Sequence, residues 1–119
     1  MTTIKNTNKS SIILATEALE EGNLVSFPTE TVYGLGGDAT NNLAIAKIFE
    51  TKNRPEFNPL IIHFAAFDQI EENCEINDDI KKLNDLFWPG PMTIILKKKK
   101  ESKISNLASA NLDTIGVRI

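Results

Sequence analysis

The chain has 119 residues, of which 41% are hydrophobic, and these values are typical of one globular domain and exclude global disorder. No stretch approaches the ~20 apolar residues of a membrane helix, and the polar N-terminus lacks the apolar segment of a signal peptide, so we expect a cytoplasmic protein without membrane contact. The net charge of −3 is uneven: residues 1–91 carry 7 Lys or Arg against 14 Asp or Glu, whereas residues 92–119 carry 6 against 2.

The first half of the chain is predicted to alternate helices with a short strand. Apolar residues repeat every three or four positions in the helical segments. Ser10 or Ser11 can cap the first helix, and Gly22 suits its left-handed end. The strand is a short apolar run that ends at Pro28. The predicted elements are a helix over about 11–21, a strand over 24–27, a loop over 29–37 and a helix from about 42 to 49.

The second half is predicted to contain three further strands and one helix. Two prolines exclude a regular helix over 52–59. The acidic run over 68–79 is interpreted as solvated loops followed by a helix start, with Asp78 or Asp79 as the cap. The predicted elements are a strand over 60–64, a helix from 78 or 79 that ends before Pro89, a strand over 92–96 and a strand over 114–119.

Strands that alternate with helices predict an α/β or mixed-sheet domain with helices packed on the sheet. The last strand reaches the end of the chain without a following helix or cap. We therefore expect a flexible N-terminal segment over residues 1–9 and, over residues 10–119, a domain that is incomplete at its C-terminal side.

The loop over Thr29–Gly37 is the first candidate binding segment. It combines hydroxyls, a carboxylate and three glycines directly after a strand, where open α/β sheets bind ligands. It lacks the dinucleotide fingerprint and the Gly-Lys-Ser/Thr ending of a P-loop, so no standard nucleotide loop is indicated. An ordinary turn and a binding loop both remain open.

Cationic residues form two further candidates. Lys52 and Arg54 are two positions apart, so in the extended conformation that Pro55 favours both side chains point to one side, as a polyphosphate site requires. Asn58 lies nearby; the alternative is a pair of solvated cations. The tract Lys97–Lys100 is typical of a solvated turn or a protected edge strand, and we assign it no chemistry.

Two residues within predicted strands need an explanation. His63, the single histidine, is either a structural residue or a ligand contact. Arg118 lies in an apolar strand, where burial requires an anionic partner such as a carboxylate. A functional role and a structural salt bridge both remain open for Arg118. With Cys74 as the single cysteine, the chain has no ligand set for structural zinc.

Four motifs in this order resemble the threonylcarbamoyl-AMP synthase family. They are FPTETVYGLG over 27–36, KNRP over 52–55 together with NPLIIH over 58–63, FWPGPMT over 87–93, and TIGVR over 114–118. The resemblance covers about residues 10–119. It implies a YrdC-like fold, which is a twisted mixed β-sheet with flanking helices.

The resemblance implies a nucleotidyltransferase that condenses L-threonine, bicarbonate and ATP into threonylcarbamoyl-AMP and pyrophosphate. The product serves the threonylcarbamoyladenosine modification of tRNA, so downstream tRNA-modification proteins and weak tRNA binding are implied. Mg²⁺ is expected with ATP, no protein-held metal site is assigned, and no covalent protein nucleophile is required. The implied ATP-binding residues are Lys52, Arg54, Asn58 and Thr114, and the implied threonine-binding residues are Thr31, His63 and Arg118.

The sequence also departs from the family pattern. The family's Ser-x-Asn motif follows the last strand, whereas Ser109-Ala110-Asn111 precedes that strand and is interpreted as a coincidence. Asn53 stands where glycine is common. Two alternatives remain: a noncatalytic RNA-binding module of the same fold, suggested by the cationic C-terminal part, and a carbamoyl-transfer relative.

Overall fold

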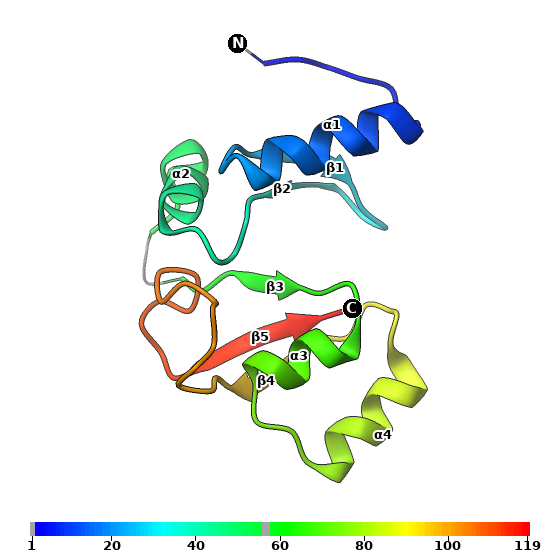
Figure 1. Ribbon diagram of the computed structural model, residues 1–119, viewed down its shortest axis with the longest axis vertical. Coiled ribbons are helices and arrows are strands. Elements are labelled where there is room, and N and C mark those ends of the chain that lie inside the picture. Colours follow the sequence, from blue (N-terminus) through cyan, green and yellow to red (C-terminus); the bar gives the residue numbers. More distant parts are fainter. Residues whose placement is uncertain (1, 56–57) are drawn as a thin grey trace.

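The computed structural model describes residues 2–55 and 58–119, and within them it contains four helices and five strands (Figure 1). Residues 56 and 57 of the predicted irregular segment lie outside the described residues, as does residue 1. In chain order the elements are α1 (Lys9–Glu20), β1 (Val25–Pro28), β2 (Tyr33–Gly36), α2 (Asn42–Lys52), β3 (Ile61–His63), α3 (Phe67–Asn73), α4 (Asp78–Phe87), β4 (Ile94–Lys97) and β5 (Thr114–Arg118).

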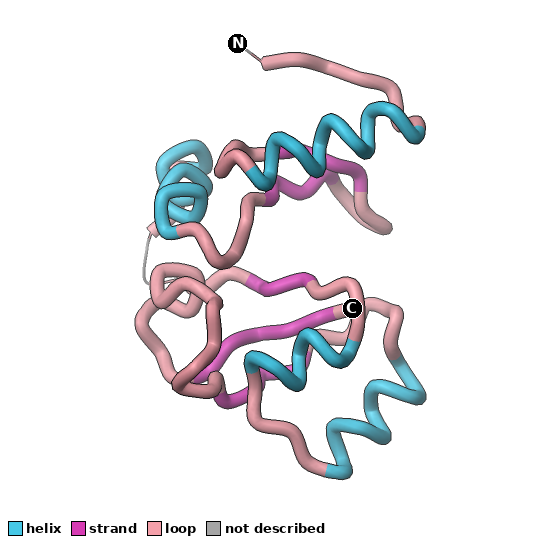
Figure 2. Tube along the Cα trace, in the orientation of Figure 1, coloured by secondary structure: helices cyan, strands magenta, loops and turns pink. Residues whose placement is uncertain are grey.

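The strands form two sheets, which Figure 2 shows as two separate groups. β1 and β2 are an antiparallel hairpin that lies beside α1 (Figure 1). The second sheet has the order β3-β5-β4, in which β5 runs parallel to β3 and antiparallel to β4. The predicted α/β class with a mixed sheet is confirmed, and the hairpin is separate from that sheet.

The central strand β5 divides the second sheet into a buried and an open face. Ile115 and Val117 point into the core, where they are 1% and 0% exposed. Because side chains alternate along a strand, Thr114 and Arg118 point to the opposite face. The core itself joins residues of α2, α3 and the three-stranded sheet. No described helix is long and apolar enough to cross a membrane.

The strand β2 lies in the segment predicted to be a loop, and this prediction was wrong. Its sequence Gly34-Leu35-Gly36 has the low strand propensity of a turn. The hairpin places the Phe27 ring over both glycines, and a Cβ at Gly36 would lie 2.8 Å from that ring. An aromatic side chain that covers cross-strand glycines therefore stabilises a segment that its own residues do not predict.

The helix α3 was also not predicted, because its residues were interpreted as a solvated acidic loop. The helix is only seven residues long and carries one fully buried side chain, Ile70. The side chain of Gln69 accepts a hydrogen bond from the backbone N–H of Ala65 and closes the first turn. So short a helix depends on the packing of Ile70 rather than on a periodic apolar pattern.

The other helices differ from prediction at their ends. Asn8 caps α1 in place of Ser10 or Ser11, and Asn77 caps α4 in place of Asp78 or Asp79. Asn, Asp and Ser are similarly good caps, so composition alone does not choose among neighbours.

Candidate active site

His63 and Arg118 are brought side by side by the pairing of two strands. They are opposite each other in the parallel register of β3 and β5. Their neighbours Ile62 and Val117 are buried, so His63 and Arg118 occupy the open face of the sheet. The His63 residue is exposed, whereas the Arg118 side chain is only 20% exposed. Two of the three predicted threonine-binding residues therefore form one cluster.

The guanidinium of Arg118 connects two loops that are distant in sequence. Its Nη2 donates to the carboxylate of Glu30 in the turn between β1 and β2. Its Nε donates to the carbonyl oxygen of Gly90 at 3.2 Å. The carboxylate partner expected for Arg118 is thus present in the chain, in the form of a salt bridge.

Glu30 was not singled out from the sequence. It is the one carboxylate in the segment Thr29–Gly37. Hydrogen bonds from its own backbone N–H and from Arg118 lower the pKa of the Glu30 carboxyl, and the charges of Arg118 and His63 act in the same direction. Glu30 is therefore ionised at neutral pH and completes a cluster of one anion, one cation and one imidazole.

Thr31 follows Glu30 in the same turn and is exposed. The hydroxyl oxygen of Thr29 organises this turn, because it accepts hydrogen bonds from the backbone N–H groups of Thr31 and Val32, each at 3.3 Å. The Thr29 hydroxyl also donates to the carbonyl oxygen of Val32. The third predicted threonine-binding residue is therefore held next to Glu30 by a locally fixed backbone.

Gly90 supports Arg118 from the other side. Its N–H donates to the carbonyl oxygen of Ile119 at 2.9 Å, in addition to the bond that its own carbonyl accepts from Arg118. A Cβ at Gly90 would lie 2.4 Å from the carbonyl oxygen of Phe87. This position therefore requires glycine.

Replacing Gly90 by Ala is expected to lower the free energy of unfolding by about 1–3 kcal/mol, the range for an overpacked site, because the backbone must move. Denaturant unfolding measures this change. Gly34→Ala is the matched control, because its Cβ would meet neighbours at 3.5 Å or more, an ordinary contact. Equal stability of Gly90→Ala and the unchanged chain would contradict the prediction.

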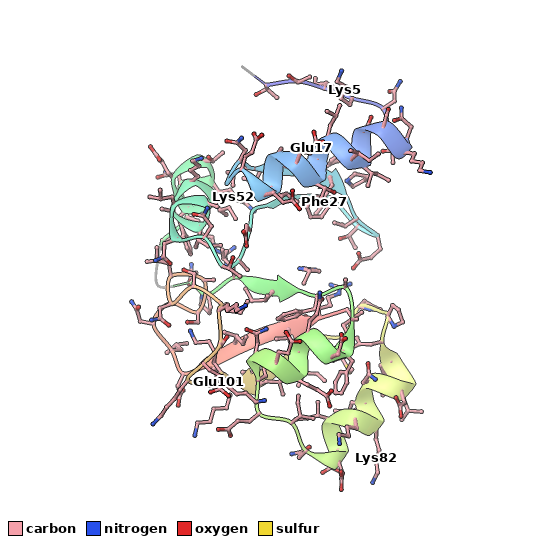
Figure 3. All side chains as sticks on the ribbon, viewed as in Figure 1. Lys5, Glu17, Phe27, Lys52, Lys82 and Glu101 are labelled. Atoms are coloured by element: carbon pink, nitrogen blue, oxygen red, sulfur yellow. The ribbon has the colours of Figure 1, made fainter. Side chains whose placement is uncertain are left out.

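Lys52 and Arg54 lie where α2 ends, and they are not part of an extended segment as predicted. Lys52 is the last residue of α2 and is exposed (Figure 3). Asn53 follows with φ 50°, in the left-handed conformation that ends many helices. Glycine is favoured in this conformation and Asn tolerates it best among other residues. Asn53 therefore fits a position at which glycine would also be favoured.

Arg54 is half-buried and partly engaged by the backbone. Its Nη2 donates to the carbonyl oxygen of Pro59 at 3.0 Å. Its Nε is buried and finds no hydrogen-bond partner among the residues that the structure describes. Asn58 is also half-buried, and its backbone N–H donates a hydrogen bond to the carbonyl oxygen of Pro55.

Thr114 begins β5 on the open face that also carries Arg118, four residues further along the strand. The predicted ATP-binding residues therefore come from two places, the end of α2 with the segment after it, and the start of β5. Ser109 is fully buried and donates to the carbonyl oxygen of Asn106, so its hydroxyl is directed into the protein.

A separate polar pocket of about 370 Å³ lies at the segment between β4 and β5. Three lysines line it, and none of the seven predicted site residues does. The lysines are Lys98, Lys100 and Lys103.

The comparisons with known proteins agree on one family. The model of the Sua5/YciO/YrdC family, described as "Telomere recombination", matches residues 17–119. A threonylcarbamoyl-AMP synthase of Pyrococcus abyssi is 46% identical over 109 residues, which are 91% of this chain and 32% of that protein. The enzyme of the same name from Bacillus subtilis is 43% identical over 115 residues, which are 96% of this chain and 33% of that protein. The chain thus spans about a third of the length of these relatives.

Solved structures give the same result. A structure of Pyrococcus abyssi Sua5 complexed with L-threonine matches with a TM-score of 0.89 and 43% identity, covering 97% of this chain and 34% of that one. Full-length HypF matches with a TM-score of 0.78 and 24% identity over 91% of this chain and 16% of that one, a likeness in fold alone.

Proposed function

Since this chain belongs to the Sua5/YciO/YrdC family, we propose that it carries the amino-acid site and part of the nucleotide site of a threonylcarbamoyl-AMP synthase. The reaction joins L-threonine, bicarbonate and ATP into threonylcarbamoyl-AMP, with release of pyrophosphate and water. The product serves threonylcarbamoyladenosine formation in tRNA, which gives the cytoplasm as the expected compartment. Relatives with this name at 43–46% identity support the activity.

The cluster of Arg118, His63 and the turn at Glu30 and Thr31 is the observation that carries the proposal. A guanidinium on an open sheet face matches a carboxylate in charge and shape. In this proposal Arg118 holds the threonine carboxylate, while Thr31 and His63 contact its other polar groups. The Pyrococcus abyssi Sua5 structure, a complex with L-threonine, supports threonine as the ligand of this site in the proposal.

The proposed chemistry requires positioning and charge neutralisation. The threonine ammonium first releases a proton to solvent, and the free amine then attacks the bicarbonate carbon. The nitrogen gives up a second proton, which leaves with the bicarbonate hydroxyl as water, and a carbamate forms. A carbamate oxygen then attacks the α-phosphorus of ATP, and pyrophosphate leaves. Lys52 and Arg54 neutralise the triphosphate, and Asn58 and Thr114 provide further contacts to ATP. The protein contributes no covalent nucleophile to these steps.

Mg²⁺ enters this proposal as part of the ATP substrate. Mg²⁺ in nucleotide sites is held by phosphates together with one or two carboxylates. Among residues 2–55 and 58–119, no three or more His, Cys, Asp or Glu side chains gather as a metal site. In this proposal Mg²⁺ arrives bound to the phosphates of ATP.

Pyrophosphate release tests the proposal, measured on a complete chain that carries these 119 residues, because the 119 residues span only about a third of the length of the relatives. With MgATP, L-threonine and bicarbonate together, we expect pyrophosphate and a product with the mass of threonylcarbamoyl-AMP. Omitting any one substrate should abolish both signals. Pyrophosphate release that is independent of threonine or bicarbonate, or no release with all three, would refute the proposal.

RNA binding is a second candidate, and the lysine-lined pocket is the observation that favours it. Residues 92–119 carry 6 Lys or Arg against 2 acidic residues. Three of these six basic residues line the pocket. The net charge of −3 for the whole chain opposes strong nonspecific binding.

If these three lysines contact duplex phosphates, the logarithm of the tRNA association constant should fall with log salt with a slope of about −2.7. Filter binding measures this slope. The double variant Lys100→Ala/Lys103→Ala should reduce it by about 2, whereas Lys82→Ala on α4 should leave it unchanged. Absent binding, or a slope near zero, would exclude this candidate.

A further inference from the structure

The ion pair between Glu30 and Arg118 is the polar link between the two sheets. Among the described residues, the side chains and backbone of β1, β2 and their turn form one hydrogen-bonded contact with the three-stranded sheet, which is this pair. The Glu30 side chain is 55% exposed. Because the Glu30 end of the pair is exposed to solvent, the pair adds less to stability than a buried pair, and a ligand carboxylate that takes the place of Glu30 leaves Arg118 with an anionic partner.

The backbone on both sides of this pair is fixed. Thr29 organises the turn that carries Glu30, and the carbonyl of Gly90 orients the Arg118 guanidinium through Nε. The Nη2 group of Arg118 thus faces the turn. Exchange of partners needs a rotation of the Glu30 side chain and no movement of the hairpin.

The charges of the pair mirror those of an α-amino acid. Glu30 contributes one negative charge and Arg118 one positive charge, whereas the ligand has an ammonium and a carboxylate on adjacent carbons. When the ligand carboxylate takes the place of Glu30 at Arg118, the freed Glu30 carboxylate needs a cation. The ligand's own ammonium provides it, and every charge remains paired.

We propose that Glu30 recognises the ammonium group of the amino-acid substrate, after exchanging its pair with Arg118 for a pair with the ligand. This inference rests on the proposed function and assigns a role within the same site. Glu30 is a specificity-determining residue in this proposal, because it favours ligands that carry an ammonium as well as a carboxylate.

A role as proton acceptor fits Glu30 less well. An efficient general base has a pKa near the working pH, whereas in the unliganded chain hydrogen bonds from the Glu30 backbone N–H and from Arg118 lower the pKa of the Glu30 carboxyl. A carboxylate that is charged at neutral pH is suited to bind the ammonium when the substrate arrives, and the pair ends when the ammonium releases its proton to solvent before the attack on bicarbonate.

The proposal has a consequence for ligands that lack the amine. 3-Hydroxybutanoate is threonine without its amino group, so it can occupy Arg118 but leaves the carboxylate of Glu30 without a partner. Because the Glu30 side chain is 55% exposed, water can solvate its unpaired carboxylate at modest cost. The preference for threonine therefore rests mainly on the ion pair that its ammonium gains. Replacing Glu30 by Gln removes the carboxylate that competes with the ligand for Arg118. It also removes the unpaired charge that remains when 3-hydroxybutanoate binds.

Calorimetric titration of the full chain with L-threonine and with 3-hydroxybutanoate tests this inference. We expect the unchanged chain to prefer threonine by about 100-fold, and Glu30→Gln to bind threonine about 10-fold more weakly. The variant should bind 3-hydroxybutanoate equally well or better, so that its preference falls to about 10-fold or less. Glu17→Gln on the exposed face of α1 (Figure 3) is the control and should keep the full preference.

The outcomes of the titrations separate the role of Glu30 from the proposed function. If Glu30→Gln keeps the preference while threonine binding is intact, the role of Glu30 is refuted and the proposed function stands. If the unchanged chain binds no threonine, both are refuted. Glu30→Asp keeps the charge and should retain most of the preference, so a loss in both variants would also refute ammonium recognition.

Discussion

Replacing Arg118 by Ala is expected to weaken L-threonine binding by about 1.5–3 kcal/mol, the range for hydrogen bonds to a charged group. The Arg118 side chain is only 20% exposed and its guanidinium is oriented by the Gly90 carbonyl, so its donors are already positioned for a carboxylate. Arg118→Lys keeps the charge but loses the planar pair of donors, and a smaller loss should follow. ATP binding should change little, because ATP has no carboxylate to place there.

Separate titrations with threonine and with ATP measure these two effects. Because Ala also releases Glu30 and Gly90, denaturant unfolding of the variant must confirm that it is folded under the conditions of the titration. Lys82→Ala removes a cation on α4, where its partner Asp79 is exposed, and is the control for charge alone. An unchanged threonine affinity in Arg118→Ala would reduce this residue to a structural partner of Glu30.

Helices and strands with a regular apolar pattern could be predicted from the sequence. The apolar residues that recur in α2 bury Ile45 and Ile48, and the run before His63 forms β3. The buried face follows the period of the element, but not every apolar residue lies on it, because Leu43 and Ile61 are 75% and 50% exposed.

Two features could not be predicted in the same way. One is that the hairpin is separate from the three-stranded sheet, and the other is that Glu30 connects the two. Glu30 and Arg118 are 88 positions apart, and nothing near Glu30 distinguishes it from a solvated carboxylate. Phe27 stabilises β2 only after the hairpin has formed. Contacts of this kind depend on the tertiary arrangement, which overrides local propensity.

The conformation at Lys52 has a local explanation that the prediction overlooked. Proline restricts the residue directly before it, which is Arg54, and leaves Lys52 free to remain helical. A cation in the last turn also complements the negative end of the helix dipole. The two cations are therefore separated by a left-handed residue, Asn53, rather than aligned on an extended strand.

Replacing Lys52 or Arg54 by Ala is expected to weaken ATP binding by about tenfold or more, because each neutralises part of the triphosphate charge and a hydrogen bond to a charged group is worth about 1.5–3 kcal/mol. Threonine carries no phosphate, and its affinity should stay within about twofold. Titrations of the full chain with MgATP and with threonine measure both values.

The two variants should differ in stability, and this difference separates binding from folding. Arg54 is half-buried and donates to the Pro59 carbonyl, so Arg54→Ala should lower the free energy of unfolding by about 1 kcal/mol or more. Lys52 is exposed at the helix end, so its removal should cost only about 0.3–1 kcal/mol. A loss of ATP affinity in Lys52→Ala therefore cannot come from unfolding. Equal losses for ATP and threonine in Lys52→Ala would contradict the assignment of these cations to the triphosphate.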